Sequence, residues 1–330
     1  MSAGAVTQSL ARDTERQLDR AKKLFIIGCP RSGTTWVQLL LAQHPSIATA
    51  PETQIFAYYM EPLRRQWAHE RAGVDREQGA AGLSRLLTEA EFEDLCRINA
   101  DFVFDRIAAR NEGAEVVVEK SPKHALQADF IQKLFPDAFF LHVVRDPRDT
   151  AVSLLAASRS WGADWAPHNI IDAARMWRDH VLSARRAGAR ADRFLEVKYE
   201  ALIADGVAQL EAIHRWLGVM SDRSTCEAAV AACDFSKLKE AKNTRELPLP
   251  GDRSPKDFFR SGSAGTGLRE LPRRQLALLE HVCGSLMEEL GYRRVTHTGA
   301  RARARIALHD GVQRVRESID WQLQRLLRKV

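Results

Sequence analysis

The sequence predicts an α/β fold of three layers, with helices on both faces of a central parallel sheet and a helical extension at the C-terminus. The main observation is that short apolar runs alternate with longer helical patterns, which is typical of parallel strands buried on both faces. The second is size. The chain has 330 residues, 45% of them hydrophobic and 28% charged, so it can bury one large core and does not have a disordered composition.

The first predicted strand is the apolar run Leu24–Gly28, which a glycine-bearing loop joins to a helix over 34–42 that ends near Pro45. A short strand can follow this helix, and residues 55–111, rich in charge and poor in breakers, are expected to be helical. The remaining predicted strands are 116–119, 139–144 and 194–198, and the remaining predicted helices are 124–135, 151–157, 170–189 and 270–291.

The C-terminal segment has the pattern of a basic amphipathic helix. Its apolar residues recur at steps of three and four from Leu308 through Val312 and Val315 to Val330, and its other face carries several arginines. Such a helix packs on its own domain, on a second copy in a homodimer, or on an anionic membrane surface. We therefore expect an N-terminal tail or helix over 1–22, one domain over 23–295 and this helix over 296–330, with an irregular loop over about 240–268.

The composition excludes several classes of protein. The five cysteines are scattered without a C-x-x-C pair, which argues against a disulfide framework or a zinc site and predicts a reducing, cytoplasmic location. Neither an apolar stretch long enough for a transmembrane helix nor the uncharged core of a signal peptide is found. The net charge of +6 suits an anionic substrate, but no nucleic-acid-binding pattern accompanies it, so no nucleic-acid partner is expected.

The loop after the first strand has the pattern of a phosphate-binding loop. Gly28–Thr35 fits G-x-x-x-x-G at the start of a helix, where backbone N–H groups can hold a phosphate, and this makes the predicted fold P-loop-type. The lysine of nucleoside triphosphatases is absent because Thr34 follows Gly33, and Arg31 supplies a cation within the loop instead. No metal site is expected, since the third strand ends in Arg145 rather than in a magnesium-binding aspartate.

Cationic residues follow the first three long strands at the point where each ends. Arg31 lies after the first strand, Lys120 after the second and Arg145 after the third. In open α/β sheets, ligands bind beyond the carboxyl ends of the strands. We therefore expect these side chains to meet an anionic ligand at one edge of the sheet.

Two of these segments resemble motifs of one family. Pro30–Trp36 looks like the 5′-phosphosulfate loop of sulfotransferases that use 3′-phosphoadenosine 5′-phosphosulfate (PAPS). Arg145 and Ser153, eight residues apart, look like the 3′-phosphate motif of the same family. The resemblance covers roughly residues 22–270. It implies sulfuryl transfer from PAPS, with 3′-phosphoadenosine 5′-phosphate (PAP) as product and no metal.

The resemblance also implies which residues bind the donor. The 5′-phosphosulfate would lie against Arg31, Ser32, Gly33, Thr34 and Thr35, and the 3′-phosphate against Arg145 and Ser153. Family members with this loop stack the adenine on the position of Trp36, and Tyr199 resembles another nucleotide contact. Arg260, Ser261 and Gly262 lie where many cytosolic members have Arg-Lys-Gly for the 3′-phosphate; here serine replaces the lysine.

Sulfuryl transfer needs a cation near the leaving oxygen and a base near the acceptor hydroxyl. Arg31 and Lys120 are the candidate cations, and Glu119–Pro122 is similar to the Glu-Lys-Ser/Thr-Pro segment of bacterial and carbohydrate sulfotransferases. Glu52 resembles the base of the tyrosylprotein sulfotransferases, and His124 is the rival candidate for this role. Both candidates stay open at the level of sequence.

Two other functions remain compatible with the sequence. A metal-dependent P-loop nucleotide kinase would need Asp146 to serve magnesium, together with a lysine from outside the loop. A non-catalytic nucleotide-binding protein would use the C-terminal helix for assembly. The acceptor of a sulfotransferase is expected to be a hydroxyl of a small molecule, a carbohydrate or a peptide, and residues 55–111 and 156–170 are expected to line its pocket.

Overall fold

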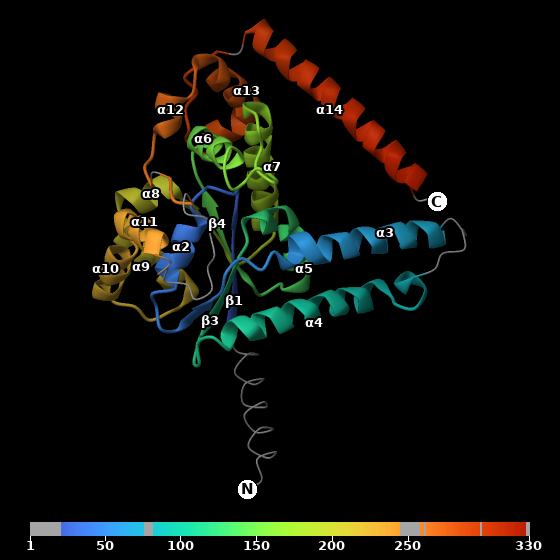
Figure 1. Cartoon of the computed structure of the whole chain (residues 1–330). Coiled ribbons are helices and arrows are strands. Elements are labelled where there is room, and N and C mark those ends of the chain that lie inside the picture. The colour runs from blue at the N-terminus through green and yellow to red at the C-terminus, as the bar shows by residue number, and fades with distance from the viewer. Residues whose placement is uncertain (1–20, 76–81, 245–257, 261, 298, 328–330) are drawn as a thin grey trace. The chain divides into compact units, whose positions relative to one another are not determined.

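The computed structural model describes residues 21–75, 82–244, 258–260, 262–297 and 299–327 (Figure 1). The chain divides into two compact units with interleaved segments. The first unit comprises the residues up to Arg145 together with Asp179–Ala264, and the second comprises Asp146–Arg178 and the residues from Gly265 onward. The predicted boundaries after residues 22 and 295 do not coincide with this division and stay predictions.

A parallel sheet lies at the centre of the first unit. Among its described residues, five strands pair in the order β2-β3-β1-β4-β5. Phe25 of the middle strand is in register with Glu119 on one side and with Phe140 on the other. The fold predicted from the alternating apolar runs is confirmed. The strands are β1 (Lys22–Gly28), β2 (Ile47–Thr49), β3 (Val116–Lys120), β4 (Phe139–Val144) and β5 (Phe194–Lys198).

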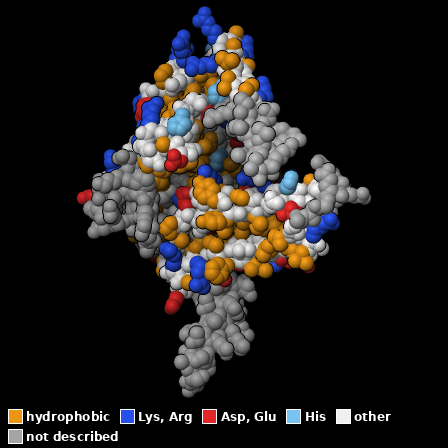
Figure 2. Space-filling view, turned by 45° about the vertical axis from the view of Figure 1, so that its right-hand side comes forward, with side chains coloured by type: hydrophobic (Ala, Val, Ile, Leu, Met, Phe, Trp, Pro, Cys, Tyr) orange, Lys and Arg blue, Asp and Glu red, His pale blue; other side chains and the backbone are white. Residues whose placement is uncertain are grey.

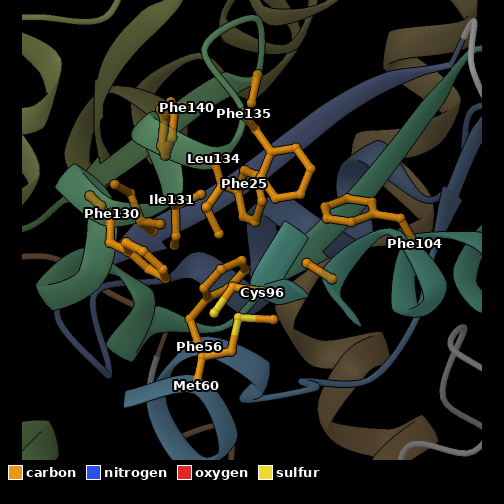
Figure 3. Close-up of a cluster of buried hydrophobic side chains, with 14 of the residues drawn as sticks. Phe25, Phe56, Met60, Cys96, Phe104, Phe130, Ile131, Leu134, Phe135 and Phe140 are labelled. Atoms are coloured by element: carbon orange, nitrogen blue, oxygen red, sulfur yellow. The ribbon is translucent and has the colours of Figure 1, made fainter. Parts of the chain in front are cut away.

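Alternate residues of the strands enter two separate hydrophobic clusters, one on each face of the sheet. Phe25 and Ile27 belong to an aromatic cluster with Phe56, Phe104 and Phe140 (Figure 3). Leu24 and Ile26 belong to an aliphatic cluster on the opposite face. Because both faces are covered, β1, β3 and β4 each contain a continuous buried apolar run, as expected for a buried parallel sheet.

Different helices cover the two faces of this sheet. The aromatic cluster is closed by η1 (Ile55–Met60), α3 (Glu61–Asp75), α4 (Glu89–Ala108), η3 (Pro122–Gln127) and α5 (Ala128–Leu134). The aliphatic cluster is closed by α2 (Thr34–Leu41), α8 (Tyr199–Ala204), α9 (Gly206–Leu217), α10 (Arg223–Ala232) and α11 (Phe235–Thr244). Hydrophobic side chains are also visible on the outer surface in Figure 2. Ile98 and Phe102 of α4 are exposed.

Most predicted helices are present, with differences at their ends. The region 55–111 is helical but is broken into η1, α3, the short η2 (Leu83–Arg85) and α4. The helix predicted over 124–135 begins earlier, as a 3₁₀ turn at Pro122. The loop predicted over 240–268 is shortened by α11 and α12, and its residues 245–257 lie outside the described part.

The second unit is built from helices. They are α6 (Pro147–Ser158), α12 (Thr266–Glu270), α13 (Arg273–Glu289) and α14 (Ala300–Leu327), while α7 (Ile170–Gly188) runs through the division between the units. Trp177 of α7 is fully buried, and the nearby Cys283 thiol of α13 contacts the Ala174 carbonyl. The predicted C-terminal helix is confirmed over 300–327. Among the described residues, no helix is long and apolar enough to span a membrane.

Candidate active site

The loop between β1 and α2 has a backbone that favours glycine at two positions. At Gly28 (φ 155°), a Cβ atom would lie 2.5 Å from the Val143 carbonyl oxygen. At Gly33 (φ 98°), it would lie 2.4 Å from the ring of Tyr199. Arg31 between them also has a left-handed backbone (φ 73°). The loop therefore turns tightly, and the free N–H groups at the start of α2 become available to an anion.

Ser32 adds an unused hydroxyl group to this loop. Its side chain is fully buried, and its Oγ atom has no hydrogen-bond partner among the described residues. Buried polar groups in folded proteins nearly always have a partner, so an orphan hydroxyl in a phosphate-type loop indicates a ligand contact.

Tyr199, at the start of α8, packs against the loop and holds two other predicted site residues. Its ring meets Trp36 edge to face, with centroids 5.7 Å apart, and the Arg145 guanidinium lies 4.3 Å from its centre. Arg145 is buried and donates a hydrogen bond to the Ser263 carbonyl at 2.8 Å. Arg145 is thus a fixed cation at the end of β4, as its position after the third strand predicted.

Arg31 lies in a strongly positive environment. Burial and, after it, the charges of Arg145 and Arg260 together lower the pKa of its guanidinium to about 10. Its guanidinium donates to the Phe258 carbonyl and lies 4.6 Å from the Phe258 ring centre. A buried guanidinium beside two further arginines forms a site that a multiply charged anion would stabilise.

A second group of contacts joins Lys120, Glu52 and Thr35. Lys120 at the end of β3 is 3% exposed, and its Nζ atom lies 2.5 Å from Glu52 Oε1 and 3.1 Å from Thr35 Oγ1. Glu52 is about one third exposed, and its Oε2 atom accepts a hydrogen bond from Gln54 Nε2 at 2.6 Å. This group combines a carboxylate that solvent can reach, a buried cation and a hydroxyl of the phosphate loop.

His124, the rival candidate for the base, is placed differently. It is fully buried in η3, and its Nε2 atom accepts a hydrogen bond from the Phe56 backbone N–H at 3.2 Å. Its Nδ1 atom lies 2.7 Å from Glu119 Oε2. Both ring nitrogens therefore face groups in the interior of the first unit, whereas about one third of the Glu52 side chain is exposed to solvent.

The other predicted donor-binding residues lie at several places. Ser153 is buried on α6, in the second unit. Arg260 contributes to the positive environment of Arg31. Gly262 has a left-handed backbone (φ 63°), and a Cβ there would lie 2.4 Å from the Phe235 ring. Ser261 lies outside the described residues.

Several site contacts were not predicted from the sequence. Gln54 bonds to Glu52, Phe258 bonds to Arg31, and Glu119 is buried beside His124. The burial of Glu119 among polar partners could have been predicted from the sequence, because a carboxylate inside the apolar run of β3 must find partners. Within the described ranges, no group of three or more His, Cys, Asp or Glu side chains is arranged to hold a metal.

The sheet, the glycine-bearing loop and the arginines beyond the strand ends define an α/β protein with a phosphate-binding loop. Residues 23–223 match the profile of the sulfotransferase family, so the chain belongs to this family. The resemblance seen in the loop and in the Arg145 segment is thereby confirmed at the level of the family.

The chain is similar to curated sulfotransferases along part of their length. It is 28% identical to a protein-tyrosine sulfotransferase of Drosophila melanogaster over 59% of this chain and 38% of the relative. It is 26% identical to protein-tyrosine sulfotransferase 2 of Gallus gallus over 59% of this chain and 51% of the relative. The chain thus spans about half, or less, of the length of these relatives.

Among solved structures, the chain resembles a mouse sulfotransferase that was crystallised with PAP. The TM-score is 0.52 at 17% identity, over 83% of this chain and 90% of the mouse chain. At this identity the likeness shows the shared fold.

Proposed function

We propose that this chain transfers a sulfuryl group from PAPS to the hydroxyl of an acceptor, by in-line displacement and without a metal. One observation carries the proposal. The buried Lys120 ammonium lies 2.5 Å from Glu52 and 3.1 Å from Thr35, so one cation contacts both a carboxylate and a hydroxyl of the phosphate loop. Sulfuryl transfer needs these elements together.

The residues of the first unit fit PAPS as the donor. Arg31 and Arg145 offer guanidinium groups that can fork onto phosphate, and the buried Ser32 hydroxyl is available to the 5′-phosphosulfate. The ring of Tyr199 fills the space in front of Gly33, and Trp36 meets it edge to face, so aromatic surface lies beside the loop for the adenine. When bound, PAPS supplies a sulfuryl group attached to a phosphate leaving group.

Glu52 acts as the general base in this proposal. It takes the proton of the acceptor hydroxyl while the acceptor oxygen bonds to sulfur and the bond from sulfur to the bridging phosphate oxygen breaks. Lys120 and Arg31 stabilise the negative charge that develops on the leaving oxygen. PAP leaves with the bonding electron pair, and Glu52 releases its proton to solvent.

The acceptor proposed for the first tests is a tyrosyl hydroxyl in a peptide. The support is that the fly and chicken relatives are protein-tyrosine sulfotransferases. A small phenol and a carbohydrate are the other acceptors to compare. Transfer is measured as the label that passes from [³⁵S]PAPS to each acceptor.

Calorimetric titration with PAP in EDTA, with ADP as the control, tests the donor site. We expect metal-free binding that depends on the 3′-phosphate. If PAP does not bind and ATP binds with magnesium, the sulfotransferase proposal is wrong and a nucleotide kinase becomes the better-supported function.

A reducing compartment such as the cytoplasm remains our proposal for the location of the chain. All five cysteines lie in the described part, and each is a buried free thiol. Burial raises the pKa of Cys96 to about 11 and that of Cys233 to about 12, so these thiols are inert. Labelling with a small thiol reagent, before and after unfolding, counts the thiols that stay reduced.

We also propose that α14 mediates association with a second copy of the chain. Leu308, Val312 and Val315 lie on one side of this helix and are 70%, 60% and 61% exposed. Removing residues 302–330 should lower the mass in solution to that of a monomer. An unchanged mass would exclude this role.

A further inference from the structure

Glu119 is a buried carboxylate in a strand that is otherwise apolar up to that position. It follows Val116–Val118 in β3 and is 1% exposed. Burying a charged group is costly unless hydrogen bonds and an opposite charge satisfy it. The partners of this carboxylate therefore indicate what the group holds in place.

These partners come from the chain just after Glu52 and from the turn after β3. Glu119 Oε1 accepts hydrogen bonds from Thr53 N at 3.3 Å, from Thr53 Oγ1 at 2.8 Å and from Ser121 Oγ at 2.7 Å. Glu119 Oε2 lies 2.7 Å from His124 Nδ1. The carboxylate thus joins three separate points of the first unit.

The backbone after Glu52 is held almost wholly by side chains. The N–H of Thr53 donates to Glu119, that of Gln54 to Ser121 Oγ at 3.1 Å, and that of Phe56 to His124 Nε2 at 3.2 Å. Gln54 has a left-handed backbone (φ 53°), and the segment enters η1 directly after it. Without the side chains of the β3 end, the N–H groups of this turn would lose these partners.

The same strand end also holds the Glu52 side chain. Lys120, next to Glu119 in β3, binds Glu52 Oε1 at 2.5 Å. We propose that Glu119 and His124 are positioning residues that clamp the backbone of residues 53–56 and thereby place the Glu52 carboxylate beside Lys120. This inference rests on the proposed function, in which Glu52 is the base.

His124 has a defined part in this clamp. Because its Nε2 atom accepts a hydrogen bond, the ring proton is assigned to Nδ1, which faces Glu119. The ring therefore links the carboxylate to the N–H of Phe56, and it acts through the Glu52 segment rather than on the acceptor.

Amide hydrogen exchange of residues 53–56 tests the clamp directly, without any acceptor. In Glu119→Gln and His124→Phe, we expect these amides to exchange about 10-fold faster or more, because local opening becomes easier. His142→Phe is the matched control. His142 is also fully buried beside a carboxylate, with Nδ1 3.1 Å from Glu196 Oε2, but it lies on β4. Unchanged exchange in both clamp variants, or equal acceleration in the control, would overturn the proposal.

Two milder variants separate the two bonds of the ring. His124→Asn keeps a donor near Nδ1, so it should retain the Glu119 contact and free the Phe56 N–H. His124→Gln places an acceptor near Nε2 and should do the reverse. If His124 positions the segment, faster exchange appears at Phe56 in the first variant and at Thr53 in the second. Identical exchange patterns in the two variants would contradict the assignment.

Turnover of PAPS then tests whether the clamp affects catalysis through Glu52. Glu119→Gln should lower kcat about 10- to 100-fold, the usual effect of a small misplacement, while the Kd for PAP changes less than about 3-fold. Adding Glu119→Gln to Glu52→Gln should cause no further loss. If Glu119→Gln lowered PAP affinity as much as kcat, or if the losses of kcat in the two single variants added up in the double variant, Glu119 would have a merely structural role. A wild-type protein that neither binds PAP nor turns over PAPS overturns the proposed function, whereas hydrogen exchange still decides the clamp.

Discussion

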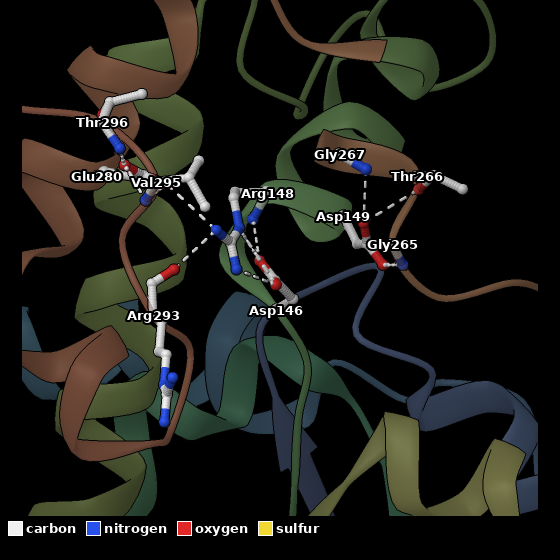
Figure 4. A network of polar contacts seen from close by, with 10 residues as sticks. All are labelled: Asp146, Arg148, Asp149, Gly265, Thr266, Gly267, Glu280, Arg293, Val295 and Thr296. Carbon is white, nitrogen blue, oxygen red and sulfur yellow. Dashed lines mark hydrogen bonds and ion pairs between the residues drawn. The ribbon is translucent and has the colours of Figure 1, made fainter. Parts of the chain in front are cut away.

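Two buried carboxylates, one in each unit, hold loops by the same chemistry. Glu119 of the first unit receives two hydrogen bonds from Thr53 and one from Ser121. Glu280 of the second unit receives the N–H groups of Val295 and Thr296 and an ion pair from Arg148 at 3.1 Å (Figure 4). Each side chain is 1% exposed.

The two carboxylates differ in what the held loop carries. The loop at Glu119 follows the proposed base, whereas the loop at Glu280 joins α13 to the segment before α14. Arg148 extends the second network to Asp146, and Asp149 nearby accepts the N–H groups of Gly265 and Gly267 (Figure 4). A buried carboxylate that receives several hydrogen bonds from a loop thus identifies a loop that is held in place. Whether catalysis depends on such a loop is decided by the residues that the loop carries.

Replacing the proposed base should have the largest effect on the reaction. Glu52→Gln removes the proton acceptor and should lower turnover of PAPS about 10²- to 10⁴-fold. PAP affinity, measured by calorimetry, should stay unchanged because the arginines and the loop remain. Full turnover in this variant would show that Glu52 is not the base, and the loop at Glu119 would then resemble the loop at Glu280.

Removing Glu280 should mainly affect stability. Glu280→Ala leaves Arg148 and two backbone N–H groups without this partner, and breaking such a buried pair costs about 3–5 kcal/mol. Urea unfolding measures the loss. Glu288→Ala is the control on the same helix, because its ion pair with Arg294 at 2.9 Å is at the surface and contributes about 0–1 kcal/mol. Equal losses in the two variants would contradict the role assigned to Glu280.

Arg145→Ala should weaken PAP binding. A charge-assisted hydrogen bond is worth about 1.5–3 kcal/mol, so we expect Kd to rise about 10- to 100-fold. Arg193→Ala is the control, since Arg193 is an exposed arginine that stacks near Phe139 at 5.0 Å. If PAP affinity is unaffected by Arg145→Ala, the 3′-phosphate is bound elsewhere.

The smallest expected effect is the change at acid pH in the contribution of Glu119 to stability. Burial acts to raise the pKa of Glu119, but the adjacent His124 ring and the hydrogen bonds from Ser121 and Thr53 outweigh it and lower the pKa to about 2. Since the folded pKa lies below the ordinary value of 4.5, this stabilisation is present above pH 4.5 and is lost as the pH falls toward 2. Unfolding midpoints at several pH values should therefore show a smaller gap between wild type and Glu119→Gln at low pH. A gap independent of pH would contradict the lowered pKa.

The sequence determined the sheet and the phosphate loop. The apolar runs of β1, β3 and β4 are strands because parallel strands buried on both faces require continuous apolar residues. The spacing of Gly28 and Gly33 predicted the turn between them, and the structure gives the reason, because a Cβ atom at either glycine would clash with Val143 or Tyr199. The cations at Arg31, Lys120 and Arg145 were also readable, since parallel strands bring their carboxyl ends to one edge.

The tertiary structure alone decided which polar residues meet. The contact of Lys120 with Glu52 joins residues 68 positions apart, and that of Arg31 with Phe258 joins residues 227 apart. Local patterns carry no information about such pairs, so the sequence left His124 open as a rival to Glu52 for the role of base. Packing separates them physically: both nitrogens of His124 are used in the interior, whereas the Glu52 carboxylate remains partly open to solvent.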